Sequence, residues 1–256
     1  MSLPFQKLRP AKVRSAVHRR WFERRVATTT LTPLPGLTDV GTPYGGWTIP
    51  GQLIDDSWLC YCIGAGGDVS FDLALIDRYV ATVRSIEPVA EYVEEAMRAA
   101  AGRDRFSAYQ AAIATADGPI RMQVTHDPGS RSLSAVGLYD TDRYIEVPGR
   151  TLESLMTELG DDHIDLLKLD IEGSEYDVVP ALDLRALGVG VFATQLHHTA
   201  SVRAARSLIE QVRSQGYQPV AIRPVLKITF LRDDQFAPAI GALSQPGSNG
   251  SRGSRR

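Results

Sequence analysis

The stretch that decides the fold of this 256-residue chain is Asp165-Leu166-Leu167-Lys168-Leu169-Asp170-Ile171-Glu172-Gly173-Ser174-Glu175-Tyr176. It has the pattern of an apolar strand that ends in two carboxylates, Asp170 and Glu172, before Gly173 breaks the strand and a helix begins. Ligands of open α/β sheets bind just outside the carboxyl ends of the strands. Carboxylates beside a core also need partners. The stretch therefore predicts a buried strand with a functional site at its end.

Strands and helices alternate on both sides of this stretch, from Ser57 onward. Such repeated units predict an α/β fold, a mostly parallel sheet with helices on both faces. A terminal hairpin around Pro224 adds an antiparallel strand at one edge. We expect strands over 58–63, 82–86, 106–114, 164–171, 191–196, 217–222 and 226–231, and helices over 71–79, 89–101, 176–187 and 201–215.

Changes in composition divide the chain into three parts. Residues 1–43 are expected to hold a basic helix and a connector, residues 44–235 the main domain, and residues 236–256 a flexible tail rich in Gly, Ser and Arg. Within the main domain, residues 119–147 form an insertion. An insertion of this length is uncommon unless it has a task, such as covering a site.

The N-terminal helix has two interpretations. Val13, Val17 and Trp21 lie at helical spacing after Pro10, which suits a helix start. The helix either docks on the domain or on a second subunit, or it offers a basic surface to an anionic partner or a membrane. We favour docking, because the apolar stripe is short.

Bulk composition excludes several classes of protein. With a net charge of −2, the protein as a whole does not attract nucleic acid electrostatically. The two cysteines, Cys60 and Cys62, form neither a disulfide framework nor a zinc site, and we interpret them as buried residues of a reducing cytoplasm rather than a redox pair. No segment reaches the roughly 18 apolar residues of a membrane span. We expect a cytoplasmic protein without stable membrane insertion and without a secretory signal.

A glycine turn follows the first strand of the main domain. In Gly64-Ala65-Gly66-Gly67-Asp68-Val69, the third glycine of the dinucleotide pattern is replaced by Val69. Glu87 ends the next strand, 21 residues after Gly66, where an acid can accept hydrogen bonds from ribose hydroxyls. The pair fits a dinucleotide or the adenosyl part of S-adenosylmethionine, and the missing glycine favours the latter. The alternatives are a tight turn without a ligand and an exposed glutamate at a helix start.

Two adjacent histidines end the fifth strand, at the same edge as Asp170 and Glu172. A neutral imidazole there can take a proton from a hydroxyl at neutral pH. In β geometry the side chains of His197 and His198 point to opposite faces, so we expect one of them to face the site. The alternative is a structural histidine with satisfied hydrogen bonds.

Together these motifs resemble the FkbM family of S-adenosylmethionine-dependent methyltransferases over residues 44 to about 231. The stretch Asp165–Val178 nearly matches the most characteristic sequence motif of that family. Further matches are 62–66 with 68–72, 85–88, 111–114 before Asp117-Gly118, 150–152, 195–198, and Tyr44-Gly45-Gly46-Trp47 with Ile49-Pro50. The resemblance implies a Rossmann-like, seven-stranded class I methyltransferase sheet and O-methylation of a hydroxyl, often on a sugar or a natural product.

The resemblance also implies roles for individual residues. The expected cofactor-binding residues are Gly64, Ala65 and Gly66 at the methionine part, Glu87 at the ribose, Gln110 and Ala111 near adenine, Asp170 beside the methyl group, and Asp68 and Ser70 in the same glycine motif. The first 43 residues and the insertion vary within the family, so no role transfers to them.

We hypothesise an in-line transfer in which a side chain accepts the proton of the attacking hydroxyl. His198 is the expected base and His197 the second choice, while Asp170 and Glu172 orient the substrate or the histidine. These carboxylates also suit a divalent ion such as magnesium. Tyr44 and Trp47 are expected to form an aromatic wall for a sugar, with core packing as the alternative.

The expected substrate is a small sugar or glycoside, such as a cell-envelope or polysaccharide precursor. The arginine-rich composition suggests an actinobacterium, and a precursor of mycobacterial methylmannose polysaccharide is one such acceptor. Alternatives are a non-sugar natural product, a nicotinamide-linked enzyme and a non-catalytic nucleotide-binding module. Nucleic acid is not expected, because the core shows no basic and aromatic stripe. A homodimer would use the N-terminal helix or the edge hairpin.

Overall fold

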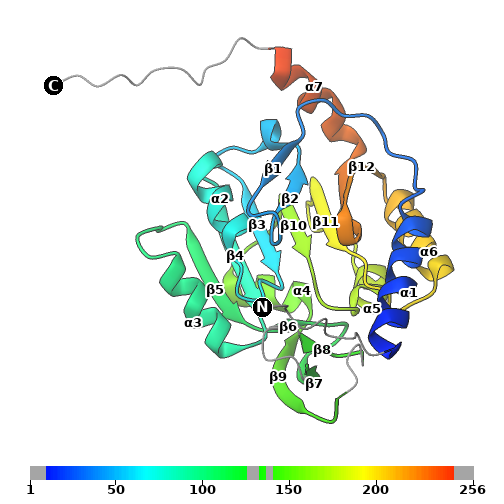
Figure 1. Ribbon diagram of the computed structural model, residues 1–256. Helices are drawn as coiled ribbons and strands as arrows, with labels where there is room; N and C mark the ends of the chain where they lie inside the picture. Colours follow the sequence, from blue (N-terminus) through cyan, green and yellow to red (C-terminus); the bar gives the residue numbers. More distant parts are fainter. Residues whose placement is uncertain (1–9, 126–132, 137–140, 245–256) are drawn as a thin grey trace, which may run out of the picture.

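The computed structural model describes residues 10–125, 133–136 and 141–244. Within them, the central sheet has seven strands in the order β12-β13-β11-β10-β3-β4-β5 (Figure 1), which confirms the predicted α/β fold. All of its neighbouring strands are parallel except where β13 is involved. The strands are β3 (Leu59–Ile63), β4 (Thr82–Glu87), β5 (Phe106–Gln110), β10 (Leu166–Leu169), β11 (Val191–Gln195), β12 (Tyr217–Arg223) and β13 (Lys227–Arg232).

The two central strands are buried on both faces, as their continuous apolar sequences predict. Along β3, Tyr61 and Ile63 face one core cluster, whereas Cys60 and Cys62 face the other. Both cysteines are buried and free, and burial raises the pKa of each thiol. A buried thiol with a raised pKa is a poor nucleophile, which agrees with a packing role.

The terminal hairpin lies at one edge of the sheet, as predicted, and the structure adds the order of its two strands. The antiparallel strand β13 lies second from the edge, between β11 and β12. The outermost strand, β12, therefore runs parallel to β11. The reason is apolar content, since β13 is buried along its length up to Arg232, and its Phe230 stacks on Phe192 of β11 at a centroid distance of 5.9 Å.

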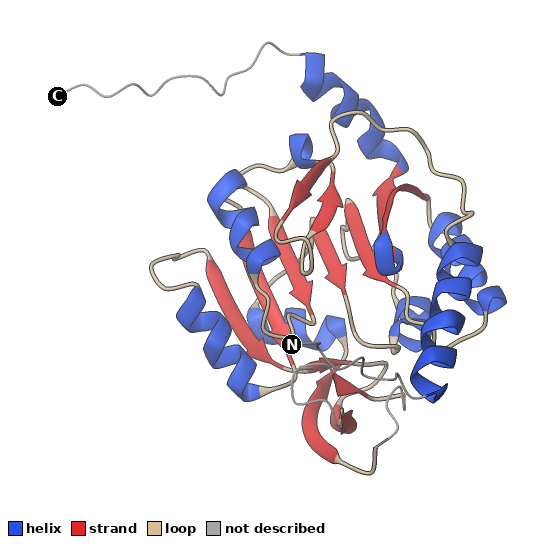
Figure 2. Ribbon diagram, viewed as in Figure 1, coloured by secondary structure: helices blue, strands red, loops and turns tan. Residues whose placement is uncertain are grey.

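Helices cover both faces of the sheet (Figure 2), as expected. One face carries α1 (Pro10–Val26), α4 (Leu152–Leu159), α5 (Glu175–Val178), η2 (Val179–Ala181) and α6 (Val202–Ser214). The other carries α2 (Ser70–Tyr79), α3 (Ala90–Ala99), α7 (Phe236–Ser244) and the hairpin of β1 (Thr38–Val40) and β2 (Trp47–Ile49). Short 3₁₀ helices are η1 (Gly51–Leu53), η3 (Pro224–Leu226) and η4 (Asp233–Gln235).

Two predicted elements are shorter than expected. The helix predicted over 176–187 ends at η2, because Pro180 has no N–H for a helical hydrogen bond and the backbone is extended at Leu182. The strand predicted over 106–114 divides into β5 and β6 (Ala112–Ile113), which pairs in another sheet. The sequence pattern is continuous there and does not mark the change of sheet.

The three-part division of the chain stays a prediction, although the structure adds detail at both boundaries. The hairpin β1–β2 pairs Val40 with Trp47 across the boundary at residues 43 and 44. In the segment expected to be a tail, α7 forms because its fully buried Ala239 packs toward η1 and accepts a hydrogen bond from Gln52 Nε2 at 3.5 Å. Residues 245–256 lie outside the described part.

The described part of the insertion forms a second sheet with the order β6-β9-β7-β8. Its further strands are β7 (Gly118–Val124), β8 (Leu133–Ser134) and β9 (Tyr144–Arg150). This sheet lies below the carboxyl ends of the central strands in Figure 1. Ser134 Oγ donates a hydrogen bond to the carbonyl oxygen of Glu172 at 2.8 Å, which ties the insertion to the acidic stretch.

None of the helices in the described ranges is both long and apolar enough to cross a bilayer. The cytoplasmic location stays a prediction.

The turn after β3 predicts the effect of two matched substitutions. Gly64 has a φ of +80°, and a Cβ atom there would lie 1.8 Å from the carbonyl oxygen of Asp170. Gly66 also has a positive φ, +56°, but nothing lies within 4 Å of a Cβ atom there. We expect Gly64→Ala to lower the free energy of unfolding by about 3 kcal/mol or more, and Gly66→Ala by about 1 kcal/mol. Urea unfolding measures both, and equal losses would contradict the close approach.

Candidate active site

A cavity of about 700 Å³ opens at the carboxyl edge of the central sheet. Its walls come from the glycine turn, the ends of β4, β10 and β11, the insertion, α1 and the segment around η3. Most of the residues predicted from the sequence line it: Tyr44, Gly64, Ala65, Gly66, Asp68, Glu87, Ala111, Asp170, Glu172, His197 and His198. The structure thus brings together residues that are up to 154 positions apart in the sequence.

The predicted aromatic wall is incomplete. Tyr44 is 82% exposed at the cavity, whereas Trp47 is fully buried and does not line it. Trp47 packs in the core under Lys227, whose Nζ lies 5.0 Å from the ring centroid. The predicted substrate contact of Trp47 therefore has no support from the geometry, which places this side chain in the core, the alternative that the sequence also allowed.

Two predicted cofactor residues also lie outside the cavity lining. Ser70 begins α2, and its Oγ accepts a hydrogen bond from the N–H of Thr42 at 2.9 Å. Gln110 is exposed at the end of β5, and its Nε2 donates to the carbonyl oxygen of Pro88 at 3.1 Å. Both side chains stabilise neighbouring loops in the structure, so their predicted cofactor contacts have no support from the geometry.

Glu87 faces the glycine turn from the end of β4. It is 4% exposed, and its two oxygens accept hydrogen bonds from the N–H groups of Gly66, at 3.0 Å, and Val89, at 3.1 Å. Burial raises the pKa of this carboxyl group, and the two N–H donors oppose the rise. Each oxygen keeps further lone pairs. Glu87 is therefore positioned to accept hydrogen bonds from a ligand in the cavity.

Asp68 closes the other side of the turn. Burial acts to raise the pKa of its carboxyl group, but hydrogen bonds from Ser70 and Thr42 outweigh burial and lower it. Thr42 Oγ1 donates to Asp68 Oδ2 at 2.7 Å. Asp68 is thus ionised at neutral pH and fixes the loop that carries Tyr44.

Two buried lysines line the cavity and were not predicted from the sequence. Lys168 Nζ donates to the carbonyl oxygens of Ile63 at 3.0 Å and Gly64 at 2.6 Å, and so ties β10 to the glycine turn. Lys227 Nζ donates to the carbonyl oxygen of Tyr44 at 2.7 Å, and burial lowers its pKa. The sequence held a local signal for Lys168, since a lysine inside the apolar run 166–169 is unusual. It held none for Lys227, because the contact of this lysine with Tyr44 spans 183 residues.

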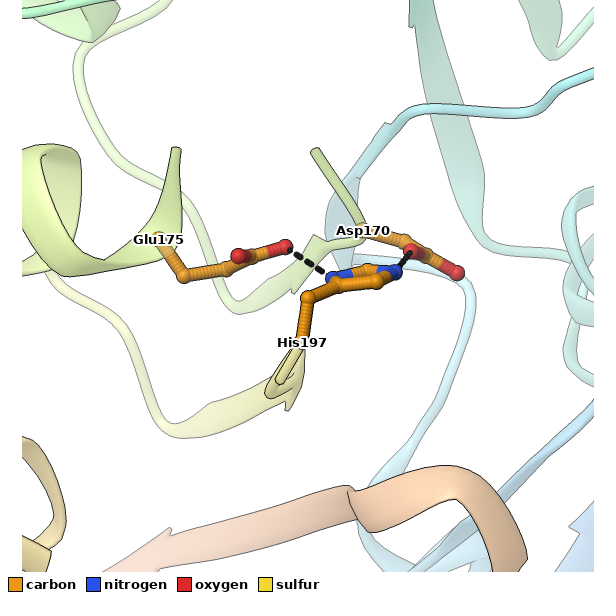
Figure 3. A group of neighbouring side chains, drawn as sticks. All are labelled: Asp170, Glu175 and His197. Carbon is orange, nitrogen blue, oxygen red and sulfur yellow. Dashed lines mark hydrogen bonds and ion pairs between the residues drawn. The ribbon is translucent and has the colours of Figure 1, made fainter. Parts of the chain in front are cut away.

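His197 lies among three carboxylates, two of which Figure 3 shows on opposite sides of the ring. Its Nδ1 lies 3.0 Å from Glu175 Oε1, and its Nε2 lies 3.3 Å from Glu172 Oε2 and 3.8 Å from Asp170 Oδ1. Burial opposes protonation, but these carboxylates outweigh it and raise the pKa of His197 to about 9. His197 is therefore a cation at neutral pH.

His198 has the opposite environment. Burial lowers its pKa, and the positive charges of His197 and Arg19 lower it further. Its imidazole is therefore neutral at neutral pH and can accept a proton. Both histidines line the cavity, contrary to the prediction that one would face away, because β11 ends at Gln195 and the alternation of side chains ends with it.

The side chains around His197 also offer ligand atoms for a metal ion. Asp170, Glu175 and His197 present atoms that lie within 4.8 Å of one another. Glu175 is fully buried, however, and its oxygens already accept hydrogen bonds from the N–H groups of Ile171, at 3.1 Å, and Gly173, at 2.9 Å. The His197 cation offsets part of the negative charge of the surrounding carboxylates.

The N-terminal helix supplies a further wall that the sequence did not predict. Arg19, Phe22 and Glu23 of α1 line the cavity, and the ring of His18 lies 6.2 Å from that of His198. The helix docks on the domain as expected, but through Phe22 and Val26, which are buried, rather than through the predicted stripe. Val17 and Trp21 of that stripe are exposed.

Comparison with known families gives one clear result. The model of the Methyltransferase FkbM domain matches residues 61–219, more than half of the chain. No curated protein sequence matches the chain.

Solved structures give more distant likenesses. The Methanococcus jannaschii fibrillarin pre-rRNA processing protein has a TM-score of 0.42 and 11% identity, covering 79% of this chain and 85% of that one. The precorrin-6y C5,15-methyltransferase from Geobacter metallireducens GS-15 has a TM-score of 0.39 and 12% identity, covering 71% and 85%.

The cation at His197 predicts a pH dependence of stability. Its folded pKa of about 9 lies above the ordinary value of 6.5, so its contribution is complete below pH 6.5 and is lost as the pH rises to about 9. We expect the free energy of unfolding to fall by roughly 3 kcal/mol over this window. Urea unfolding at several pH values should show this fall in the parent and in the control His198→Gln. His197→Gln should lack it, and an unchanged fall in that variant would contradict the assignment.

Proposed function

The chain belongs to the FkbM methyltransferase family, and from that premise we propose that it transfers a methyl group from S-adenosylmethionine to a hydroxyl of a sugar or glycoside. It is an S-adenosylmethionine-dependent methyltransferase with a Rossmann-like sheet. The observation that carries the hydroxyl as acceptor is a neutral histidine, His198, in the same cavity as the glycine turn, Asp170 and Glu172. A hydroxyl must lose its proton during transfer, and a neutral imidazole accepts one.

The cavity residues fit the methyl donor. Gly64 has no side chain where the turn meets Asp170, so the turn can lie directly against the end of β10 at the edge of the cavity. Glu87 suits the ribose hydroxyls, and Ala111 with Pro88 offers apolar contact for the adenine ring. Bound there, the donor supplies an electrophilic methyl group on a sulfonium. The chain then has to align the acceptor and remove its proton.

The acceptor hydroxyl has polar partners on the other side of the cavity. We assign its orientation to Asp170 and Glu172, whose carboxylates lie near the His197 cation. Carboxylates accept hydrogen bonds from sugar hydroxyls, and the exposed ring of Tyr44 can pack against the apolar face of a sugar. This combination supports a sugar or glycoside as the acceptor.

The proton of the acceptor goes to a ring nitrogen of His198. His197, the second choice as base, is already protonated at neutral pH. Its charge instead holds Asp170 and Glu172 in position, and Glu175 fixes its ring through Nδ1. The two histidines therefore have separate roles, one as base and one as a positioning cation.

A magnesium ion does not suit this donor set. Magnesium prefers oxygen ligands in octahedral geometry, and imidazole is a ligand of softer metals. Both oxygens of Glu175 already accept N–H groups, and the His197 cation offsets part of the charge of the neighbouring carboxylates. We propose that the transfer proceeds without a divalent ion.

A non-sugar natural product is the second candidate acceptor. Ile120, Met122 and Leu133 of the insertion give the cavity an apolar wall, which suits a less polar molecule. The neutral base His198 would serve a phenol or an alcohol equally well. The two candidates therefore differ in the acceptor and share the donor and the base.

Transfer of a labelled methyl group tests the acceptor class directly. We expect label from S-adenosylmethionine to appear in a mono- or disaccharide, methylated mannosides included, when sugars and phenolic natural products are screened side by side. EDTA should leave the rate within about twofold, because the proposed steps use no metal. Label in phenols alone would contradict the sugar proposal. Loss of activity in EDTA with recovery in magnesium would contradict the metal-free transfer.

Removal of the proposed base gives a second test. We expect His198→Ala to lower kcat by roughly 100-fold or more, because general bases contribute about this much, while S-adenosylhomocysteine binds with nearly unchanged affinity. In the parent, kcat/KM should fall in acid with a midpoint below pH 6.5, since the pKa of His198 is lowered. Steady-state kinetics and isothermal titration measure these effects. Full activity of His198→Ala would exclude this histidine as the base.

A further inference from the structure

Positive charge is concentrated at the N-terminal end of the chain. Residues 1–26 hold eight of the 28 Lys and Arg residues but one of the 30 Asp and Glu residues. The net charge of −2 therefore hides a basic segment on an otherwise acidic protein. Such asymmetry is typical of segments that bind an anionic partner.

The basic segment includes helix α1, which has one buried and one exposed side. Phe22 and Val26 are buried against the domain, and Arg206 Nη2 donates to the carbonyl oxygen of Arg25 at 2.7 Å, which fixes α1 on α6. Figure 1 shows α1 on the outside of the molecule, beside α6. The fold therefore holds α1 through one side and leaves the other to solvent.

The exposed side of α1 combines apolar and basic residues. Val17 is 62% exposed and Trp21 is 49% exposed, four positions apart on the helix. Arg20 and Arg24 are exposed beside them. An exposed tryptophan beside arginines suits the headgroup region of an anionic bilayer, where aromatic side chains lie at the boundary and basic residues meet lipid phosphates.

The contacts of Trp21 favour a lipid surface over nucleic acid. Its ring stacks on His18 at a centroid distance of 6.0 Å, and Arg25 lies 5.8 Å from its centroid. A base would have to displace these neighbours in order to stack on Trp21, whereas an interfacial tryptophan needs only an apolar edge and a polar surrounding.

Charge also disfavours a second copy of the chain as the occupant. A two-fold contact between copies would place Arg20 and Arg24 of one helix near the same residues of the other. Like charges at such a contact repel each other, whereas the phosphate groups of an anionic bilayer attract them.

The helix lies next to the entrance of the active-site cavity. Arg19 and Glu23, on the turns that carry Val17 and Trp21, line that cavity. A surface bound by α1 would thus lie beside the entrance, where an acceptor held at that surface could reach the site.

We propose that the exposed side of α1, formed by Val17, Arg20, Trp21 and Arg24, is a docking surface for an anionic lipid bilayer. The binding is peripheral, with the arginines on lipid phosphates and Trp21 at the boundary between headgroups and acyl chains. It places the cavity at the membrane, where lipid-linked acceptors lie. The docking itself does not depend on the acceptor class proposed above.

Co-sedimentation with vesicles tests the surface. We expect the full chain to sediment with vesicles of phosphatidylcholine and phosphatidylglycerol but not with phosphatidylcholine alone, and salt should weaken the binding. Each basic residue near an anionic surface contributes about fivefold in partitioning, so Arg20→Gln/Arg24→Gln should lower it roughly 30-fold. Trp21→Ser should weaken binding even at low salt. The matched control is Arg98→Gln, an arginine of α3 with a side chain that is 65% exposed, and it should bind like the parent.

We expect every variant to bind S-adenosylhomocysteine as the parent does, which would show that the variants are folded. This control also distinguishes a failure of membrane docking from a failure of the proposed methyl transfer. Four results would overturn the proposal. The parent could fail to bind the mixed vesicles at low salt, or Arg98→Gln could lose as much binding as the double variant. RNA that displaces the vesicles would assign the surface to nucleic acid, and a dimer that Trp21→Ser dissociates would assign it to a second copy.

Discussion

The close approach of the glycine turn to the end of β10 is the constraint on which the rest of the site depends. Gly64 lies against the carbonyl group of Asp170, and the ammonium group of Lys168 bonds to the carbonyl oxygens of Ile63 and Gly64. Gly64 also donates its N–H to the carbonyl oxygen of Ile86 at 2.8 Å. The ends of β3, β4 and β10 are thus joined at one point. The glycine turn, where we propose that the methyl donor binds, meets there the carboxylates that we propose for the acceptor.

The carboxylates held at this point give the two adjacent histidines, His197 and His198, pKa values that are shifted in opposite directions. His197 lies within the field of Glu175, Asp170 and Glu172 and becomes a cation, and that cation in turn contributes to keeping His198 neutral. Neighbouring groups whose pKa values are driven apart are a mark of acid–base sites. The proposed base therefore depends on its neighbour, because without the carboxylates around His197 the two rings would titrate in a similar range.

The sequence predicted most of the fold and most of the residues that meet at the glycine-turn side of the cavity, because these parts depend on local patterns. Apolar runs revealed the buried strands, and Glu87 followed from its spacing to the glycine turn. The misplaced residue Trp47 and the missed residue Lys227 have another cause. Their contact joins segments 180 residues apart, which no local pattern records. The two histidines were misjudged because strand periodicity was extended past Gln195, where the strand ends.

The walls of the cavity also differ in origin. The glycine turn, Glu87, Asp170 and both histidines lie within residues 61–219, which match the family model. Arg19 and Glu23 of α1, Tyr44 and Lys227 line the same cavity from outside that range. Membership of the family therefore bears on the methyl donor, and the proposed base also lies within the matched range. The remaining walls, which include α1, lie in segments that the family match does not cover, and the exposed side of α1 belongs to one of these segments.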